Sequence, residues 1–171
     1  MPWWTNALYD TCSLITPDKI LLDHPEIEAH VQPILSIEPC FQADQLRQET
    51  AARMQSRVDY LDMPDVPELT RILATAQLSK AIAQVDTFIY ATAVHYQYTV
   101  ITGDKRLAQA LVRECLRVGN VALMLKTLVS NQVVSETACN AILADLVTRH
   151  DFILPPNRLQ TWATLRRYTF P

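Results

Sequence analysis

The chain has 171 residues, enough to bury the core of one domain, and its 49% hydrophobic and 19% charged content indicates a globular fold and excludes a disordered one. A formal net charge of −3 offers no global attraction for nucleic acid, so any RNA binding must use local basic patches. Only two glycines are present, Gly103 and Gly119, which excludes glycine-rich phosphate loops of the dinucleotide or P-loop kind.

The cysteines and the N-terminal stretch predict a cytoplasmic protein. The four cysteines are far apart, with no CxxC and no zinc spacing, so we expect reduced core thiols; they are Cys12, Cys40, Cys115 and Cys139. The N-terminal stretch lacks a basic region and carries Asp10 within its apolar run, which does not fit a signal peptide. No apolar window reaches transmembrane length. We expect Trp3 and Trp4 to cover a sheet edge rather than to stack on bases.

The first third of the chain predicts strands separated by helices. Residues 6–9 form the expected first strand, and Asp10 and Thr11 follow it directly. Residues 17–31 predict one or two short helices broken at a proline, with Asp18 in solvent. Residues 34–37 form a second apolar strand. A long helix is then expected from Pro39 to about residue 57.

The middle of the chain contains the most informative stretch, DTFIYATAVHYQYTVITGDKRL. Before it, residues 57–61 predict a third strand, and a proline-rich loop leads into a helix that starts near Pro67. Asp86 is expected to be the N-cap of the next helix. Residues 98–101 read as a buried parallel strand, and Gly103 supplies a tight turn before Asp104. Residues 105–112 are good helix formers.

The last third predicts mainly helices. Residues 115–118 fit a short strand or a continuing helix, and both interpretations stay open. A strongly apolar helix is expected over 121–129, and Ser135 is expected to cap the helix after it. A final helix should run through Trp162 and Leu165. Strands that alternate with helices imply a parallel sheet, and the acids that follow strands should meet at its C-terminal edge.

On these residues the chain resembles the PIN-domain nucleases, a family that includes the VapC-type toxins of prokaryotic toxin–antitoxin pairs. The resemblance lies in the stretch from Asp86 to Leu107 and in the opening pair Asp10 and Thr11. The helical tail resembles PIN-like prokaryotic proteins that have a longer helical C-terminus. The resemblance implies an α/β fold, a three-layer sandwich with a central, mainly parallel sheet. It further implies a single domain over 1–171, with a core over about 5–118 and a helical C-terminal extension over about 119–171.

The resemblance also implies a site and a chemistry. Four catalytic acids would hold Mg²⁺ or Mn²⁺, hard cations that prefer carboxylate oxygens; they are Asp10, Asp44, Asp86 and Asp104. The family usually has Glu where Asp44 stands, so Glu49 is a fallback ligand and Glu38 a weaker one. Lys105 or Arg106 would hold the substrate phosphate, and Thr11 or Thr102 would orient a ligand or water.

The implied function is a ribonuclease that acts on RNA, as the toxin of a toxin–antitoxin pair with an antitoxin partner and as a homodimer. The alternative is a PIN-like binding or regulatory module that has lost catalysis, with Asp44 marking that loss. On local evidence alone, Asp86 and Asp104 fit an ordinary helix cap and turn, and Asp44 fits a first-turn helix residue. Residues 104–126 carry five basic and two acidic residues, which fits either an RNA patch or a solvated helix face.

Overall fold

The computed structural model describes residues 2–43 and 46–171. All strand pairs are parallel, and they join into one five-stranded sheet with the order β3-β2-β1-β4-β5. The strands are β1 (Leu8–Tyr9), β2 (Ile34–Ser36), β3 (Val58–Tyr60), β4 (Val100–Ile101) and β5 (Val118–Gly119). The expected parallel sheet is therefore confirmed. Of the two interpretations of residues 115–118, the strand is closer, but β5 contains only Val118 of that range and continues to Gly119.

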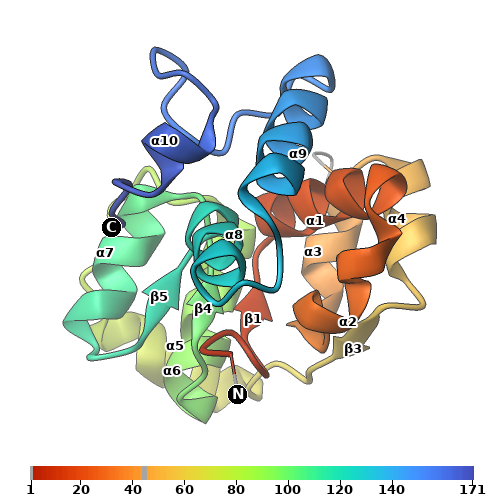
Figure 1. Ribbon diagram of the computed structural model, residues 1–171. Coiled ribbons are helices and arrows are strands. Elements are labelled where there is room, and N and C mark those ends of the chain that lie inside the picture. Colours follow the sequence, from red (N-terminus) through yellow and green to blue (C-terminus); the bar gives the residue numbers. More distant parts are fainter. Residues whose placement is uncertain (1, 44–45) are drawn as a thin grey trace.

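Helices cover both faces of this sheet (Figure 1). In chain order they are α1 (Thr11–Asp23), η1 (Pro25–Ile27), α2 (Glu28–Val31), α3 (Glu38–Gln42), α4 (Gln48–Met54), α5 (Val66–Thr75), α6 (Gln84–Tyr96), α7 (Lys105–Arg113), α8 (Val121–Ser130), α9 (Glu136–Thr148) and α10 (Trp162–Leu165). Helix α1 packs on α4, α8 and α9, whereas α6 packs on α5 and α7 behind the sheet. This is the layering of an α/β fold. Within the described residues, the helices are too short or too polar to cross a bilayer.

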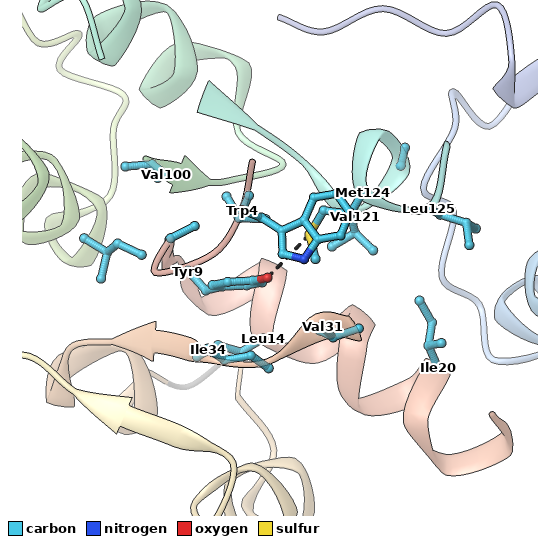
Figure 2. Close-up of a cluster of buried hydrophobic side chains, with 14 of the residues drawn as sticks. Trp4, Tyr9, Leu14, Ile20, Val31, Ile34, Val100, Val121, Met124 and Leu125 are labelled. Atoms are coloured by element: carbon cyan, nitrogen blue, oxygen red, sulfur yellow. Dashed lines mark hydrogen bonds between the residues drawn. The ribbon is translucent and has the colours of Figure 1, made fainter. Parts of the chain in front are cut away.

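One part of the core lies between the sheet and the α1 and α8 layer (Figure 2), and the same cluster continues to buried residues of α6 and α7. Tyr9 of β1 is fully buried, and its hydroxyl contacts the Met124 sulfur at 3.5 Å. Burial raises the pKa of Tyr9, since nothing there stabilises a phenolate. Leu165 near the end of the chain is also 0% exposed and belongs to the same hydrophobic cluster as Trp4. The C-terminal helices are therefore packed on the body of the protein.

One of the two N-terminal tryptophans lies where the sequence predicts. Trp4 is 1% exposed, and its indole N–H donates to the His30 carbonyl at 2.9 Å. Trp3 packs so closely on the edge strand β5 that a Cβ on Gly119 would lie 1.9 Å from its ring. Trp3 also donates to Thr127 Oγ1 at 3.2 Å. Trp3 thus covers the edge strand β5, as expected, whereas Trp4 belongs to the buried core.

The following expectations about local structure are wrong. The long helix from Pro39 is two short helices, α3 and α4, with an extended residue, Ala43, ending the first. Asp18 is not in solvent: it is 1% exposed and receives a two-pronged ion pair from Arg53 at 2.6 and 2.8 Å. Gly103 does not have a positive φ, and a Cβ there would have nothing within 4 Å, so the turn does not require glycine.

The cysteine expectation is correct for only part of the set. All four are thiols and not disulfides, and Cys40 and Cys139 are buried as expected. Cys12 and Cys115 are exposed. Cys12 lies in the first turn of α1, close to the C-terminal end of β1.

Candidate functional site

Asp10 is the buried acid at the centre of the sheet edge. It directly follows β1, is 2% exposed, and caps α1 by accepting the Ser13 backbone N–H at 2.7 Å. Its other oxygen accepts the Thr102 hydroxyl. Burial raises the pKa of Asp10, the hydrogen bonds from Thr102 and Ser13 oppose that rise, and the charge of Asp104 adds to it. Asp10 is thus held in one orientation, in a position where its charge is costly.

Thr102 connects Asp10 with Asp104. It directly follows β4, is 0% exposed, and donates its hydroxyl to Asp10. The same oxygen accepts the Asp104 backbone N–H at 3.0 Å. Asp104 caps α7 by accepting the backbone N–H groups of Arg106 at 2.6 Å and Leu107 at 2.9 Å, both through Oδ1. The two acids therefore belong to one hydrogen-bonded unit that spans the ends of β1 and β4.

Asp86 approaches this unit from α6. The pKa of Asp86 is raised to about 6, first by burial and then by the charges of Asp10 and Asp104. The expectation that Asp86 is the N-cap is wrong, because Ala83 has the extended backbone of the cap and Asp86 is the third residue of the helix. Acids are favoured both at the cap and in the first turn, where the helix dipole is positive, so composition alone does not separate the two positions.

The sheet topology explains why these acids meet. In the order β3-β2-β1-β4-β5 the chain leaves β1 toward β2 on one side, while β4 lies on the other side. The loops that follow β1 and β4 therefore diverge, and open parallel sheets bind their ligands in the crevice that such a switch point creates. Asp10 and Asp104 follow these two strands. Helix α6 runs into β4, so its first turn with Asp86 lies at the same edge.

Cys12 reports the combined field of the acids. Partial burial raises the pKa of its thiol to about 11, and the charges of Asp10, Asp86, Asp104 and Asp151 contribute in that order. We expected Cys12 in the core, although its position two residues after Asp10 is a signal that it lies at the strand end. Asp151 comes from the tail, and no pattern in the sequence connects it with this edge.

The other expected site residues lie in different places. Lys105 and Arg106 are exposed in the first turn of α7, beside Asp104. Thr11 donates to the Cys40 carbonyl at 3.4 Å, so its hydroxyl faces α3 rather than the acids. Asp44 lies outside the described residues. The two fallback acids are exposed and line other cavities. Glu49 lines a cavity together with Asp18 and Arg53, and Glu38 lines a cavity together with Tyr60.

The donor chemistry of the edge suits a hard divalent cation, because three carboxylates with mutual repulsion gain from a bound positive charge. Among the described residues, however, no three His, Cys, Asp or Glu side chains are arranged so that they could hold a metal ion. A physical reason is visible: Asp10 is engaged with Thr102 and Ser13, and Asp104 with the start of α7. Asp10, Asp86 and Asp104 are electrostatic neighbours, but they are not a closed coordination shell.

Compared with known proteins, the chain matches no family model, no curated protein and no solved structure. Its function is therefore inferred from its own residues and their geometry.

Proposed function

We propose that the protein is a Mg²⁺- or Mn²⁺-dependent endoribonuclease of the PIN-domain kind, which hydrolyses phosphodiester bonds in RNA. The observation that carries the proposal is the electrostatic coupling of Asp10, Asp86 and Asp104 at the crevice between β1 and β4. Acids such as Asp10 and Asp86, whose pKa is raised by burial and by neighbouring carboxylates, are typical of a functional site. The parallel sheet and its strand order are compatible with the three-layer sandwich expected for that family.

Each residue of the crevice has a part in this proposal. Asp10, Asp86 and Asp104 would hold the cation, with Asp44 as the fourth acid, and Thr102 fixes the orientation of Asp10. A bound cation of this type neutralises phosphate charge and lowers the pKa of a coordinated water. Lys105 and Arg106, exposed beside Asp104, bind the substrate phosphates.

RNA cleavage by the purified protein tests the proposal. We expect cleavage with Mn²⁺ or Mg²⁺ and none with a chelator, and a loss of at least about 100-fold in Asp86→Asn, in line with the loss of a charged catalytic group. Asp62→Asn is the matched control, since Asp62 is an exposed acid that follows β3 at the same edge of the sheet. Equal activity in Asp86→Asn and Asp62→Asn would exclude the crevice as the active site.

A second candidate is a PIN-like module that binds RNA and does not cleave it. It is favoured by the lack of a closed metal shell in the part of the chain that the structure describes, and by the shorter Asp44 where the family usually has Glu. Asp44→Glu separates the candidates. If the wild type is inactive with either metal and Asp44→Glu creates cleavage, the module is the correct assignment. If the wild type cleaves RNA and Asp44→Glu retains cleavage, the protein is an enzyme.

The proposal extends to partners and location. As the toxin of a toxin–antitoxin pair, the protein would bind a protein antitoxin and form a homodimer. It would act in the cytoplasm, where its thiols stay reduced. Growth arrest on expression, relieved by the product of an adjacent gene, tests the toxin role, and the mass of the purified protein in solution tests the dimer.

A further inference from the structure

A cavity of about 460 Å³ opens directly beside the acids. One wall comes from the sheet edge, with Cys12 and Ser13 of α1, Lys105 of α7 and Asn120 at the start of α8. The other wall comes from the tail, in the segments 151–156 and 168–171. Small-molecule sites occupy roughly 300 to 1,000 Å³, so this cavity has the size of a ligand site.

The tail wall is fixed to the body of the protein. Asn120 Nδ2 donates to the Tyr168 hydroxyl at 2.9 Å, and Lys126 Nζ donates to the Tyr168 carbonyl at 2.8 Å. On the other side, the Asp151 carboxylate accepts from Thr16 Oγ1 and pairs with Lys19 Nζ, both at 3.1 Å. The cavity is thus a preformed part of the fold. A ligand would not have to order the tail, which favours binding.

The lining has two kinds of groups that a nucleotide needs. Phe152, Tyr168 and Phe170 bring aromatic rings to the tail wall, and aromatic side chains bind bases by stacking. Lys105 brings an ammonium group that has no hydrogen bond or ion pair with any residue the structure describes. Cys12 lines the cavity and also lies in the field of Asp10, Asp86 and Asp104, so the cavity borders the crevice.

We propose that this cavity binds one nucleotide of a single-stranded RNA, with the base against the tail aromatics and the phosphate at Lys105. A base can enter only when it is unpaired and unstacked, so the cavity selects single strands over duplexes. The identification of the nucleotide as part of RNA rests on the proposed function. Binding of a free mononucleotide, in contrast, requires neither metal nor cleavage.

Calorimetric titration of the metal-free protein with 5′-AMP and with 5′-UMP tests whether the cavity binds a nucleotide. We expect Phe152→Ala and Phe170→Ala to weaken binding by about 5- to 150-fold, the range for loss of one base stack. Tyr96→Ala is the matched control, an exposed aromatic on α6 that is not in the cavity lining. Lys105→Gln should weaken binding of the nucleotides but leave binding of the phosphate-free nucleosides unchanged. Thermal unfolding confirms that each variant is folded.

The results separate this inference from the proposed ribonuclease activity. The inference is overturned if the wild type binds neither nucleotide, or if Tyr96→Ala weakens binding as much as Phe152→Ala and Phe170→Ala. Cleavage of RNA without mononucleotide binding would overturn the cavity and leave the nuclease intact. Mononucleotide binding that depends on the tail aromatics, in a wild type that cleaves no RNA, would support the cavity and exclude the nuclease.

Discussion

Asp86 shows how a single charge in the crevice affects stability. Its pKa is raised from the ordinary aspartate value of 3.8 to about 6 in the folded protein, so the folded state binds the proton more tightly than the unfolded state. The contribution of Asp86 to the free energy of unfolding therefore falls as pH rises from about 4 to 6 and stays low above that. Since the group is half-buried, we discount the shift for screening and assign about 1 kcal/mol to it.

Asp86→Asn removes that charge and should stabilise the protein at pH 7. The expected rise in Tm is about 2 to 4 °C for a chain of this size, and it should vanish near pH 4, where Asp86 is protonated. Thermal unfolding at the two pH values measures both. The same gain at both pH values would mean that packing is the cause, and not the burial of the Asp86 charge and its repulsion from Asp10 and Asp104.

Comparison of Thr102 with Thr92 measures how much the hydrogen bonds at the crevice stabilise the fold. Both are 0% exposed, but Thr102 bonds to Asp10 and Asp104, whereas the Thr92 hydroxyl has no partner among the described residues. Thr102→Val should cost about 1 to 3 kcal/mol, because it leaves Oδ2 of the buried Asp10 carboxylate without its donor while Oδ1 keeps the Ser13 backbone N–H. Thr92→Val should be neutral or stabilising. Urea unfolding of both variants tests this, and equal losses would contradict it.

At the scale of elements, the two glycines should respond in opposite directions. A Cβ on Gly119 of β5 would displace the Trp3 ring, which is held by Thr127, by a perpendicular contact with Trp4 at 5.3 Å and by Arg117 at 5.3 Å. Gly119→Ala should therefore cost about 1 to 3 kcal/mol. Gly103→Ala should add about 0.4 to 1 kcal/mol, because its backbone suits alanine and its Cβ has room. If Gly103→Ala is destabilised instead, the turn before Asp104 does require glycine, as the sequence predicts.

The strands and most helices could be predicted because their signals are local. The apolar runs at β1, β2 and β4 are bounded by turn residues, and the Ser135 cap of α9 is seen as expected, accepting from Ala138 N at 3.1 Å. The break between α3 and α4 could not be predicted, because the intervening residues carry neither proline nor glycine. The burial of Asp18 was missed for a related reason. Its partner Arg53 lies on another helix, and no local pattern connects them.

Some features of the candidate site could also be predicted from the sequence, and others could not. Asp10 and Asp104 can be predicted because Asp10 directly follows the apolar run of β1 and Asp104 lies in the short turn between β4 and α7, and both positions can be read from the sequence. The bridge through Thr102 and the approach of Asp151 depend on contacts between segments far apart in the chain, so only the structure reveals them. Asp44, the acid on which the choice between enzyme and module depends, lies outside the described residues.

At the scale of the whole molecule, one hydrophobic cluster extends from Trp4 to Leu165. The tail is packed on α8 and α9 through α10, and it also forms one wall of the cavity beside the acids. A ligand that binds at the sheet edge therefore contacts a wall that is continuous with the core. Binding there should appear as a change in the stability of the entire chain, because anything that binds only the folded state stabilises it.

Mn²⁺ should accordingly stabilise the protein. At about 100 times its dissociation constant, the gain is about 2.7 kcal/mol, which corresponds to a rise in Tm of about 5 to 10 °C at 2 to 4 °C per kcal/mol. Thermal unfolding with and without Mn²⁺ measures it. Asp86→Asn should lose most of the shift, because it removes a ligand while keeping the caps made by Asp10 and Asp104.

The same measurement identifies the fourth acid. Asp44→Ala should reduce the Mn²⁺ shift, and Asp44→Glu should retain or enlarge it, because glutamate is longer by one methylene. Glu49→Ala is the control, since Glu49 lines the separate cavity of Asp18 and Arg53. If the shift survives Asp44→Ala but is lost in Glu49→Ala, the fourth ligand is Glu49, and α4 must move toward β1 when metal binds. If Mn²⁺ produces no shift in the wild type at any concentration, the crevice does not bind metal, and the RNA-binding module becomes the better assignment.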